Sequence, residues 1–107
     1  MEEFVQVSTT VERREDGARI AGALVEERLA ACVQVVGPIS STYRWQGVVE
    51  RSEEWLLLVK TKRDLYGMVE EVICGLHPYE VPEVIAVPLI LGSSDYLGWM
   101  RAELLDE

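Results

Sequence analysis

The segment from His77 to Glu83 concentrates more chemically active side chains than any other part of the sequence. It reads His-Pro-Tyr-Glu-Val-Pro-Glu and places an imidazole, a phenol and two carboxylates around two prolines. Each proline fixes its own φ and biases the preceding residue toward extended backbone, so the loop presents its polar groups from a stiff frame. Stiff polar loops often serve a ligand or a partner. The alternative is that Pro78 ends a helix, Pro82 begins an edge strand, and the charges are solvated.

Metal ligation is the first chemistry that these residues suggest. His77 is the sole histidine, and Glu80 and Glu83 follow it closely. Imidazole and carboxylate together suit Cu(II) or Zn(II). Cys32 could add a soft thiolate ligand or act as a nucleophile, although its apolar neighbours equally favour a small buried hydrophobe. Cys74, three residues before His77, is not expected to form a zinc pair with it, because its helical phase places it on the opposite arc from the apolar residues.

Catalysis is not predicted. The sequence contains no Gly-rich phosphate loop, nucleophile elbow or His-Glu-x-x-His motif. Glu80 or Glu83 could act with His77 in a hydrolysis only inside a pocket, which the sequence cannot supply. Lys60 ends an apolar strand. Its long aliphatic stem can carry the ammonium group to water, and this role is favoured over that of a reactive amine.

Composition limits the kind of partner. The chain has 107 residues, of which 49% are hydrophobic and 27% charged, and it is expected to form one domain over residues 1–107. Its net charge of −9 argues against nucleic acid and anionic membrane surfaces. The acidic start, Met1-Glu2-Glu3, does not resemble a signal peptide, and no apolar run approaches membrane-spanning length. We therefore expect a cytoplasmic protein whose two cysteines are reduced.

The hydrophobic pattern predicts a β-α-β-β-α-β order followed by a C-terminal helix. The expected elements are a strand at 4–7, a helix at 16–31, a bent hairpin arm at 32–45, a return arm at 48–62, a helix from its cap Asp64 to 76, a strand at 84–87 and a helix capped by residues 93–95. Arg28 interrupts the apolar arc of the first helix. It is expected to lie in the last turns of that helix, where its positive charge interacts favourably with the negative end of the helix dipole. This order indicates an α+β, ferredoxin-like sandwich with both main helices on one face of an antiparallel sheet.

The two hairpin arms are too long for one small domain to cover. Strands typically run about five or six residues, whereas each arm here exceeds a dozen. The distal half would expose Tyr43, Trp45, Val48 and Val49 together with unpaired strand edges. A homo-oligomer such as a trimer is the expected cover for the hairpin and for the second face of the sheet.

Several motifs together resemble the CutA family of divalent-cation tolerance proteins. They are Leu29-Ala30-Ala31-Cys32-Val33, Ser41-Thr42-Tyr43-Arg44-Trp45-Gln46-Gly47, Leu57-Leu58-Val59-Lys60-Thr61, the run from His77 to Glu83, and Tyr96-Leu97-Gly98-Trp99. The resemblance spans nearly the whole chain. It implies a ferredoxin-like protomer in a tight homotrimer, similar to PII-type signalling proteins.

The resemblance also implies a cleft between subunits and a link to copper and other divalent metals. Carried over position by position, the cleft would contain Cys32, Tyr43, Trp45, Lys60, His77, Tyr79, Glu80 and Glu83. Three positions depart from the family pattern. Ser8 and Leu76 stand where some members have a cysteine and a second histidine, and Gln34 stands where an asparagine is common.

Two functions follow as hypotheses. In the first, the protein is a metal-response trimer that binds Cu(II) or a similar ion weakly at intersubunit clefts, with His77, Cys32, Glu80 and Glu83 as candidate ligands. In the second, it is a PII-like signalling or adaptor trimer without catalysis. A small metabolite or a protein partner would then bind at a cleft formed by Tyr43, Trp45, Lys60 and Tyr79.

Overall fold

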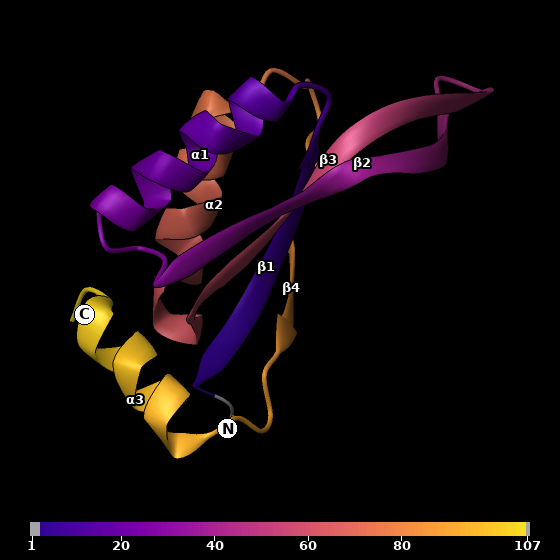
Figure 1. Ribbon diagram of the computed structural model, residues 1–107. Helices are drawn as coiled ribbons and strands as arrows, with labels where there is room; N and C mark the ends of the chain where they lie inside the picture. Colours follow the sequence, from indigo (N-terminus) through magenta and orange to yellow (C-terminus); the bar gives the residue numbers. More distant parts are fainter. Residues whose placement is uncertain (1–2, 107) are drawn as a thin grey trace.

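The computed structural model describes residues 3–106 and shows an elongated α+β molecule (Figure 1). Met1 and Glu2, which belong to the acidic start that does not resemble a signal peptide, lie outside the described residues, as does Glu107. The elements are β1 (Phe4–Val11), α1 (Arg14–Glu26), β2 (Cys32–Trp45), β3 (Val48–Lys62), a 3-10 turn η1 (Arg63–Leu65), α2 (Tyr66–Leu76), β4 (Ile85–Pro88) and α3 (Ser94–Glu103). The predicted α+β class and the order of the main elements are confirmed.

The strands form one antiparallel sheet in the order β2-β3-β1-β4. The central strand β1 shows why one face is buried: Val5, Val7 and Val11 alternate toward the helices, whereas Gln6 and Ser8 point to the other face. Helices α1 and α2 lie side by side on the buried face (Figure 1). The opposite face, free of α1 and α2 and called the helix-free face below, is covered near Phe4 by Arg101 of α3, and its remainder is left to solvent or to a partner.

The core lies between this pair of helices and the inner strands. Its fully buried aliphatic side chains include Val7, Val11, Ile20, Leu24, Leu57, Val59, Val69 and Ile73. Gly17 lets α1 approach the sheet, because a Cβ at this position would lie 3.0 Å from Leu57 Cδ1 and 3.2 Å from Val11 Cγ2. Within residues 3–106 no helix is both long and apolar enough to cross a bilayer.

The first helix ends earlier than its hydrophobic period predicts. It stops at Glu26, and Arg28 adopts a left-handed backbone with φ of 61°. The Arg28 guanidinium donates 2.9 Å hydrogen bonds to the carbonyls of Ala102 and Glu103 at the end of α3. The prediction that Arg28 sits in the last turns of its own helix is therefore wrong. The cation does meet the negative end of a helix dipole, but that helix is α3.

Two capping predictions have different outcomes. Ser93 accepts a 3.2 Å hydrogen bond from the Tyr96 amide and caps α3, as the sequence indicates. Asp64 instead lies inside the 3-10 turn, and α2 begins at Tyr66 without a side-chain cap. The last strand is also shifted by one residue and includes Pro88, which an edge strand tolerates.

The β2–β3 hairpin projects well beyond the rest of the molecule (Figure 1). With the hairpin included, the principal extents are 44 × 25 × 22 Å. Gln46 and Gly47 both have positive φ, 51° and 82°, which is typical of the two-residue turn that matches the twist of a hairpin. The register shifts between Val36 and Ile39, where the strand bends. Gly37 is required at this bend, because a Cβ there would lie 2.7 Å from the Trp55 ring.

A buried threonine provides a test of this packing. Thr9 is fully buried, and its Oγ1 has no hydrogen-bond partner among residues 3–106. Because Thr9→Val removes an unsatisfied hydroxyl at nearly constant volume, we expect the free energy of unfolding to rise by about 1–2 kcal/mol. Urea denaturation at neutral pH measures the change.

Thr61→Val is the matched control. Thr61 is equally buried, but its hydroxyl donates a 2.6 Å hydrogen bond to the Leu29 carbonyl. This substitution leaves a buried acceptor unpaired and should lower stability by about 1 kcal/mol or more. Equal effects of the two substitutions would contradict the assignment of an unpaired hydroxyl to Thr9.

Candidate ligand pocket

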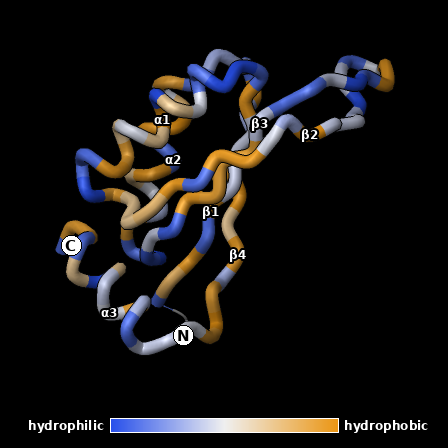
Figure 2. Tube along the Cα trace, in the orientation of Figure 1, coloured by the Kyte–Doolittle hydropathy of each residue, from blue (hydrophilic) through white to orange (hydrophobic). Residues whose placement is uncertain are grey.

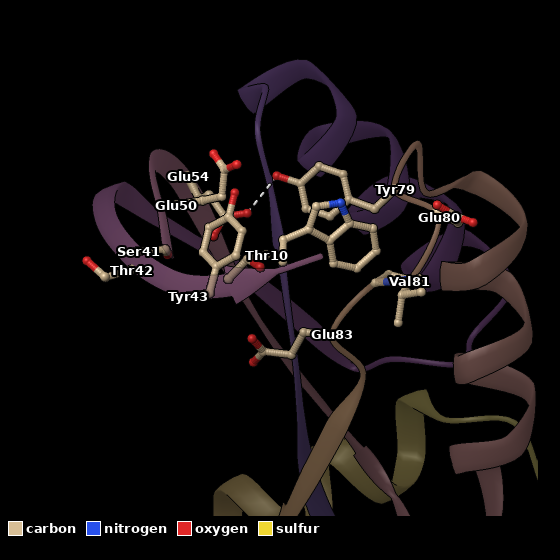
Figure 3. Close-up of a pocket in the computed structure, with 12 residues that line it drawn as sticks. Thr10, Ser41, Thr42, Tyr43, Glu50, Glu54, Tyr79, Glu80, Val81 and Glu83 are labelled. Carbon is tan, nitrogen blue, oxygen red and sulfur yellow. Dashed lines mark hydrogen bonds between the residues drawn. The ribbon is translucent and has the colours of Figure 1, made fainter. Parts of the chain in front are cut away.

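A pocket of about 790 Å³ lies between the hairpin and the loop that follows α2 (Figure 3). Its walls come from the end of β1, from both arms of the hairpin and from the loop at 79–83. The lining residues are Thr10, Ser41, Thr42, Tyr43, Trp45, Glu50, Glu54, Tyr79, Glu80, Val81, Pro82 and Glu83. The proline-rich loop thus forms one wall of a concave site, as its stiffness suggested.

A short hydrogen bond between Tyr79 and Glu54 joins the loop to the hairpin. The Tyr79 hydroxyl donates to Glu54 Oε2 at 2.6 Å, and Figure 3 marks this contact. Glu54 is only 5% exposed. Burial, together with the hydrogen bond to Glu54 and the nearby negative charge, raises the pKa of Tyr79 far above its ordinary value. The phenol therefore stays protonated and remains a donor throughout the physiological pH range.

His77 fixes the start of the same loop. It is 9% exposed, its Nε2 lies 2.8 Å from the Thr10 carbonyl oxygen, and its Nδ1 accepts a 3.2 Å hydrogen bond from the Tyr79 amide. These contacts are satisfied together by the neutral tautomer that carries its proton on Nε2. The His77 and Tyr79 rings pack at a centroid distance of 4.7 Å. His77 orients the loop from beneath and does not line the pocket.

Both ring nitrogens of His77 are thus engaged within the protomer. A metal ion could bind Nδ1 only if the Tyr79 amide released it, because a nitrogen lone pair cannot serve a hydrogen bond and a metal at once. Within residues 3–106, no group of three or more histidine, cysteine, aspartate or glutamate side chains is arranged to hold a metal ion. Of the candidate ligands, only Glu80 and Glu83 line the pocket.

The aromatic candidates lie together at the pocket. Tyr43 and Trp45 line the pocket from the distal half of β2 and are 43% and 40% exposed. The Tyr43 hydroxyl lies 3.3 Å from Ser52 Oγ on the neighbouring arm. In Figure 3 the Tyr43 and Tyr79 side chains converge on Glu54 from opposite walls. Three of the four predicted small-molecule contacts, Tyr43, Trp45 and Tyr79, therefore share one pocket.

Cys32 and Lys60 lie elsewhere in the protomer. They are paired across β2 and β3 on the helix-free face of the sheet, and Lys60 Nζ donates a 2.7 Å hydrogen bond to Gln34 Oε1. Residue 60 is four positions along β3 from Leu56, which pairs with Thr10. At about 3.4 Å per residue, four residues separate Cys32 from the level of Thr10 in the pocket by roughly 14 Å. One chain alone does not bring Cys32 and Lys60 to the pocket.

The sequence interpretation missed Glu54 and Glu50. Both belong to the charged stretch that precedes the apolar part of β3, and such a stretch is usually solvated. Glu54 is instead buried, because its pairing with Ile39 at the bend directs it beneath Tyr79. Its position opposite the predicted bend of the first hairpin arm is the one sequence signal that could have indicated it.

The chain matches known proteins along nearly its whole length. A family model described as CutA1 divalent ion tolerance protein matches residues 5–103. The "Divalent-cation tolerance protein CutA" of Thermus thermophilus is 50% identical over 101 residues, which cover 94% of this chain and 96% of that protein. The Arabidopsis thaliana "Protein CutA, chloroplastic" is 43% identical over 97 residues, and the match spans 53% of that longer protein.

Solved structures agree in fold. The divalent cation tolerance protein Cut A1 of Thermus thermophilus superposes with a TM-score of 0.92 at 46% identity, covering 94% of this chain and 98% of that one. CutA1 of Oryza sativa superposes with a TM-score of 0.95 at 39% identity, covering 99% and 97%. Strands, helices and hairpin are therefore shared with these proteins.

The Tyr79–Glu54 contact can be tested by Tyr79→Phe. Because the substitution leaves the buried Glu54 carboxylate without its donor, we expect the free energy of unfolding at pH 7 to fall by about 1–3 kcal/mol. Tyr43→Phe, which removes only the long and exposed contact to Ser52, should change stability by less than about 0.5 kcal/mol.

The same variant should alter the response to alkaline pH. The folded pKa of Tyr79 lies above its ordinary value of 10.0, so its contribution to stability is complete below pH 10 and is lost as the pH rises toward the raised pKa. The free energy of unfolding should decline more steeply above pH 10 in the wild type than in Tyr79→Phe. Urea denaturation at several alkaline pH values measures both slopes, and parallel slopes would contradict the raised pKa.

Proposed function

Because this chain belongs to the CutA1 family of divalent ion tolerance proteins, we propose that it acts as a homotrimeric divalent-cation tolerance protein. In this proposal, Cu(II) or a similar divalent ion binds weakly where the protomers meet. The observation that carries the proposal is the family match over residues 5–103, which includes all the helices and strands apart from Phe4, the first residue of β1. The family resemblance inferred from the sequence motifs is confirmed by this match.

Exposed apolar groups support the trimer. The protomer leaves Val48 and Val49 at the hairpin tip 56% and 51% exposed, and Ile85 and Val87 on β4 56% and 50% exposed. Figure 2 shows hydrophobic residues at the hairpin tip, well away from the core. Single exposed apolar residues are common, but two groups at opposite ends of the sheet favour burial between subunits.

The edges of the sheet support the same arrangement. Strands β2 and β4 are the two outer strands, so each presents a row of unpaired backbone groups. An edge of β2 that pairs with a different edge on the next copy forms a head-to-tail contact, and three such contacts can close into a ring. The antiparallel order β2-β3-β1-β4 also supports a ferredoxin-like protomer.

Separation of the candidate ligands within one chain explains why a metal site is placed between chains. Cys32 lies on the helix-free face, whereas Glu80 and Glu83 lie at the pocket near His77. An adjacent protomer that covers the helix-free face could bring the two groups together. If His77 Nδ1 bound the metal ion, it would lose its hydrogen bond from the Tyr79 amide. This loss would offset part of the binding free energy and keep the affinity for the metal low.

No catalytic role is part of this proposal. The relatives carry the name of tolerance proteins rather than of an enzyme class. A cytoplasmic location stays a prediction from the sequence, since one similar protein is named chloroplastic and a similar structure from Archaeoglobus fulgidus is named periplasmic.

Native mass spectrometry and titration calorimetry test the two parts separately. We expect a three-chain species at micromolar protein concentration, and a monomer would overturn the trimer. Cu(II) and the redox-inactive Zn(II) should each bind weakly, and both His77→Ala and Cys32→Ser should reduce that binding. Cys74→Ser is the control, because Cys74 is exposed on α2. Isotherms unchanged by the first two substitutions would remove these residues as ligands.

A further inference from the structure

We propose that the pocket beside Glu54 binds a small organic cation, namely a protonated alkylamine, held by Glu54 and by the aromatic walls. This inference concerns a ligand class different from a divalent metal ion, and every residue that it uses belongs to one chain. It rests on the charge, the aromatic content and the hydrogen-bonding state of the pocket within one chain.

The charge of the lining selects a cation. Glu50, Glu54, Glu80 and Glu83 supply carboxylates, and no lysine, arginine or histidine lines the pocket in the part of the chain that the structure describes. His77, directly beneath, is neutral in the tautomer that its two contacts require. An anionic ligand would meet several carboxylates and no compensating charge, so the pocket excludes it.

The walls favour an organic cation. Tyr43, Trp45 and Tyr79 contribute aromatic rings, and Val81 and Pro82 contribute apolar surface. Aromatic faces attract ammonium groups through their quadrupole and pack against alkyl carbons. A hydrated metal ion gains little from such walls, whereas an alkylamine uses both the charge and the apolar surface. The volume of about 790 Å³ falls within the range of small-molecule sites.

Glu54 provides the specific polar contact. It is 5% exposed, and only one of its oxygens, Oε2, has a hydrogen-bond partner among residues 3–106. The second oxygen belongs to a side chain that lines the pocket. This oxygen is not sealed from solvent, since Thr9 Oγ1 is the one fully buried side-chain polar atom without a partner among residues 3–106. An ammonium group that enters the pocket can therefore reach it and supply both a hydrogen-bond donor and the opposite charge.

The arrangement of the carboxylates separates an amine from a metal. No three of them converge closely enough to hold a metal ion within residues 3–106. In Figure 3 the Glu83 and Glu54 side chains come from different walls of the pocket. A flexible diamine can reach carboxylates on two walls, since its charges are separated by a carbon chain.

Titration calorimetry of the full chain with 1,4-diaminobutane tests the proposal. The buffer contains EDTA, so that metal binding does not contribute, and 1,4-butanediol of the same length serves as the neutral probe at matched ionic strength. We expect the diamine to bind and the diol to give no measurable heat. Absence of diamine binding, or equal binding of the diol, would overturn the proposal, whatever the outcome for metals.

Charge-neutralising variants locate the site. Glu54→Gln should weaken diamine binding at least about tenfold. Glu26→Gln, which makes the same charge change at the exposed end of α1, should leave it unchanged. Glu83→Gln, at an exposed position, should also weaken diamine binding. If Glu54→Gln does not fold, this variant tests whether the pocket carboxylates bind the diamine. Equal affinities in the pocket variants and Glu26→Gln would show that net charge alone attracts the diamine, and would overturn the assigned site.

Discussion

The hydrogen bond between Tyr79 and Glu54 is the contact on which the functional geometry depends. It connects a loop after α2 to the middle of β3, two segments that are 25 residues apart in the chain. His77 holds the same loop to the end of β1 through the Thr10 carbonyl. Without these two attachments the proline-rich loop would have no fixed distance from the hairpin, and the pocket would lose one wall. The loop is stiff by sequence, but it is placed by buried polar contacts.

Much of the fold could be predicted from the sequence because it depends on local patterns. Alternation along β1, the two positive-φ residues of the hairpin turn and the Ser93 cap are each encoded within a few residues. The failures arise where distant parts meet. Arg28 leaves its expected helix because the carbonyl ends of α3 offer it better hydrogen bonds. No periodicity along the first helix contains that information, since the partner lies more than 70 residues away.

The candidate site was likewise predictable only where it depends on residue type and not on contacts between distant segments. Residue types identified Tyr43, Trp45, Tyr79, Glu80 and Glu83, and all five line one pocket. Residue types could not say that Cys32 and Lys60 lie farther along the sheet, away from the pocket, because this follows from strand register. They also could not find Glu54, whose burial is decided by a bend in the opposing strand. The family match supplies the general function, while the local geometry indicates what each side chain can contact.

The bend at Gly37 has a mechanical consequence for the proposed trimer. Trp55 closes against the backbone of a residue without a side chain, so the direction of the whole projecting arm is determined at one contact. From this hinge to the tip at Trp45 the strand runs about 26 Å. Rotation by as little as five degrees would move the tip by about 2 Å, roughly the difference between close packing and a gap. In the trimer proposed above, the angle at which copies meet would thus be fixed within a single subunit, far from the surfaces that touch.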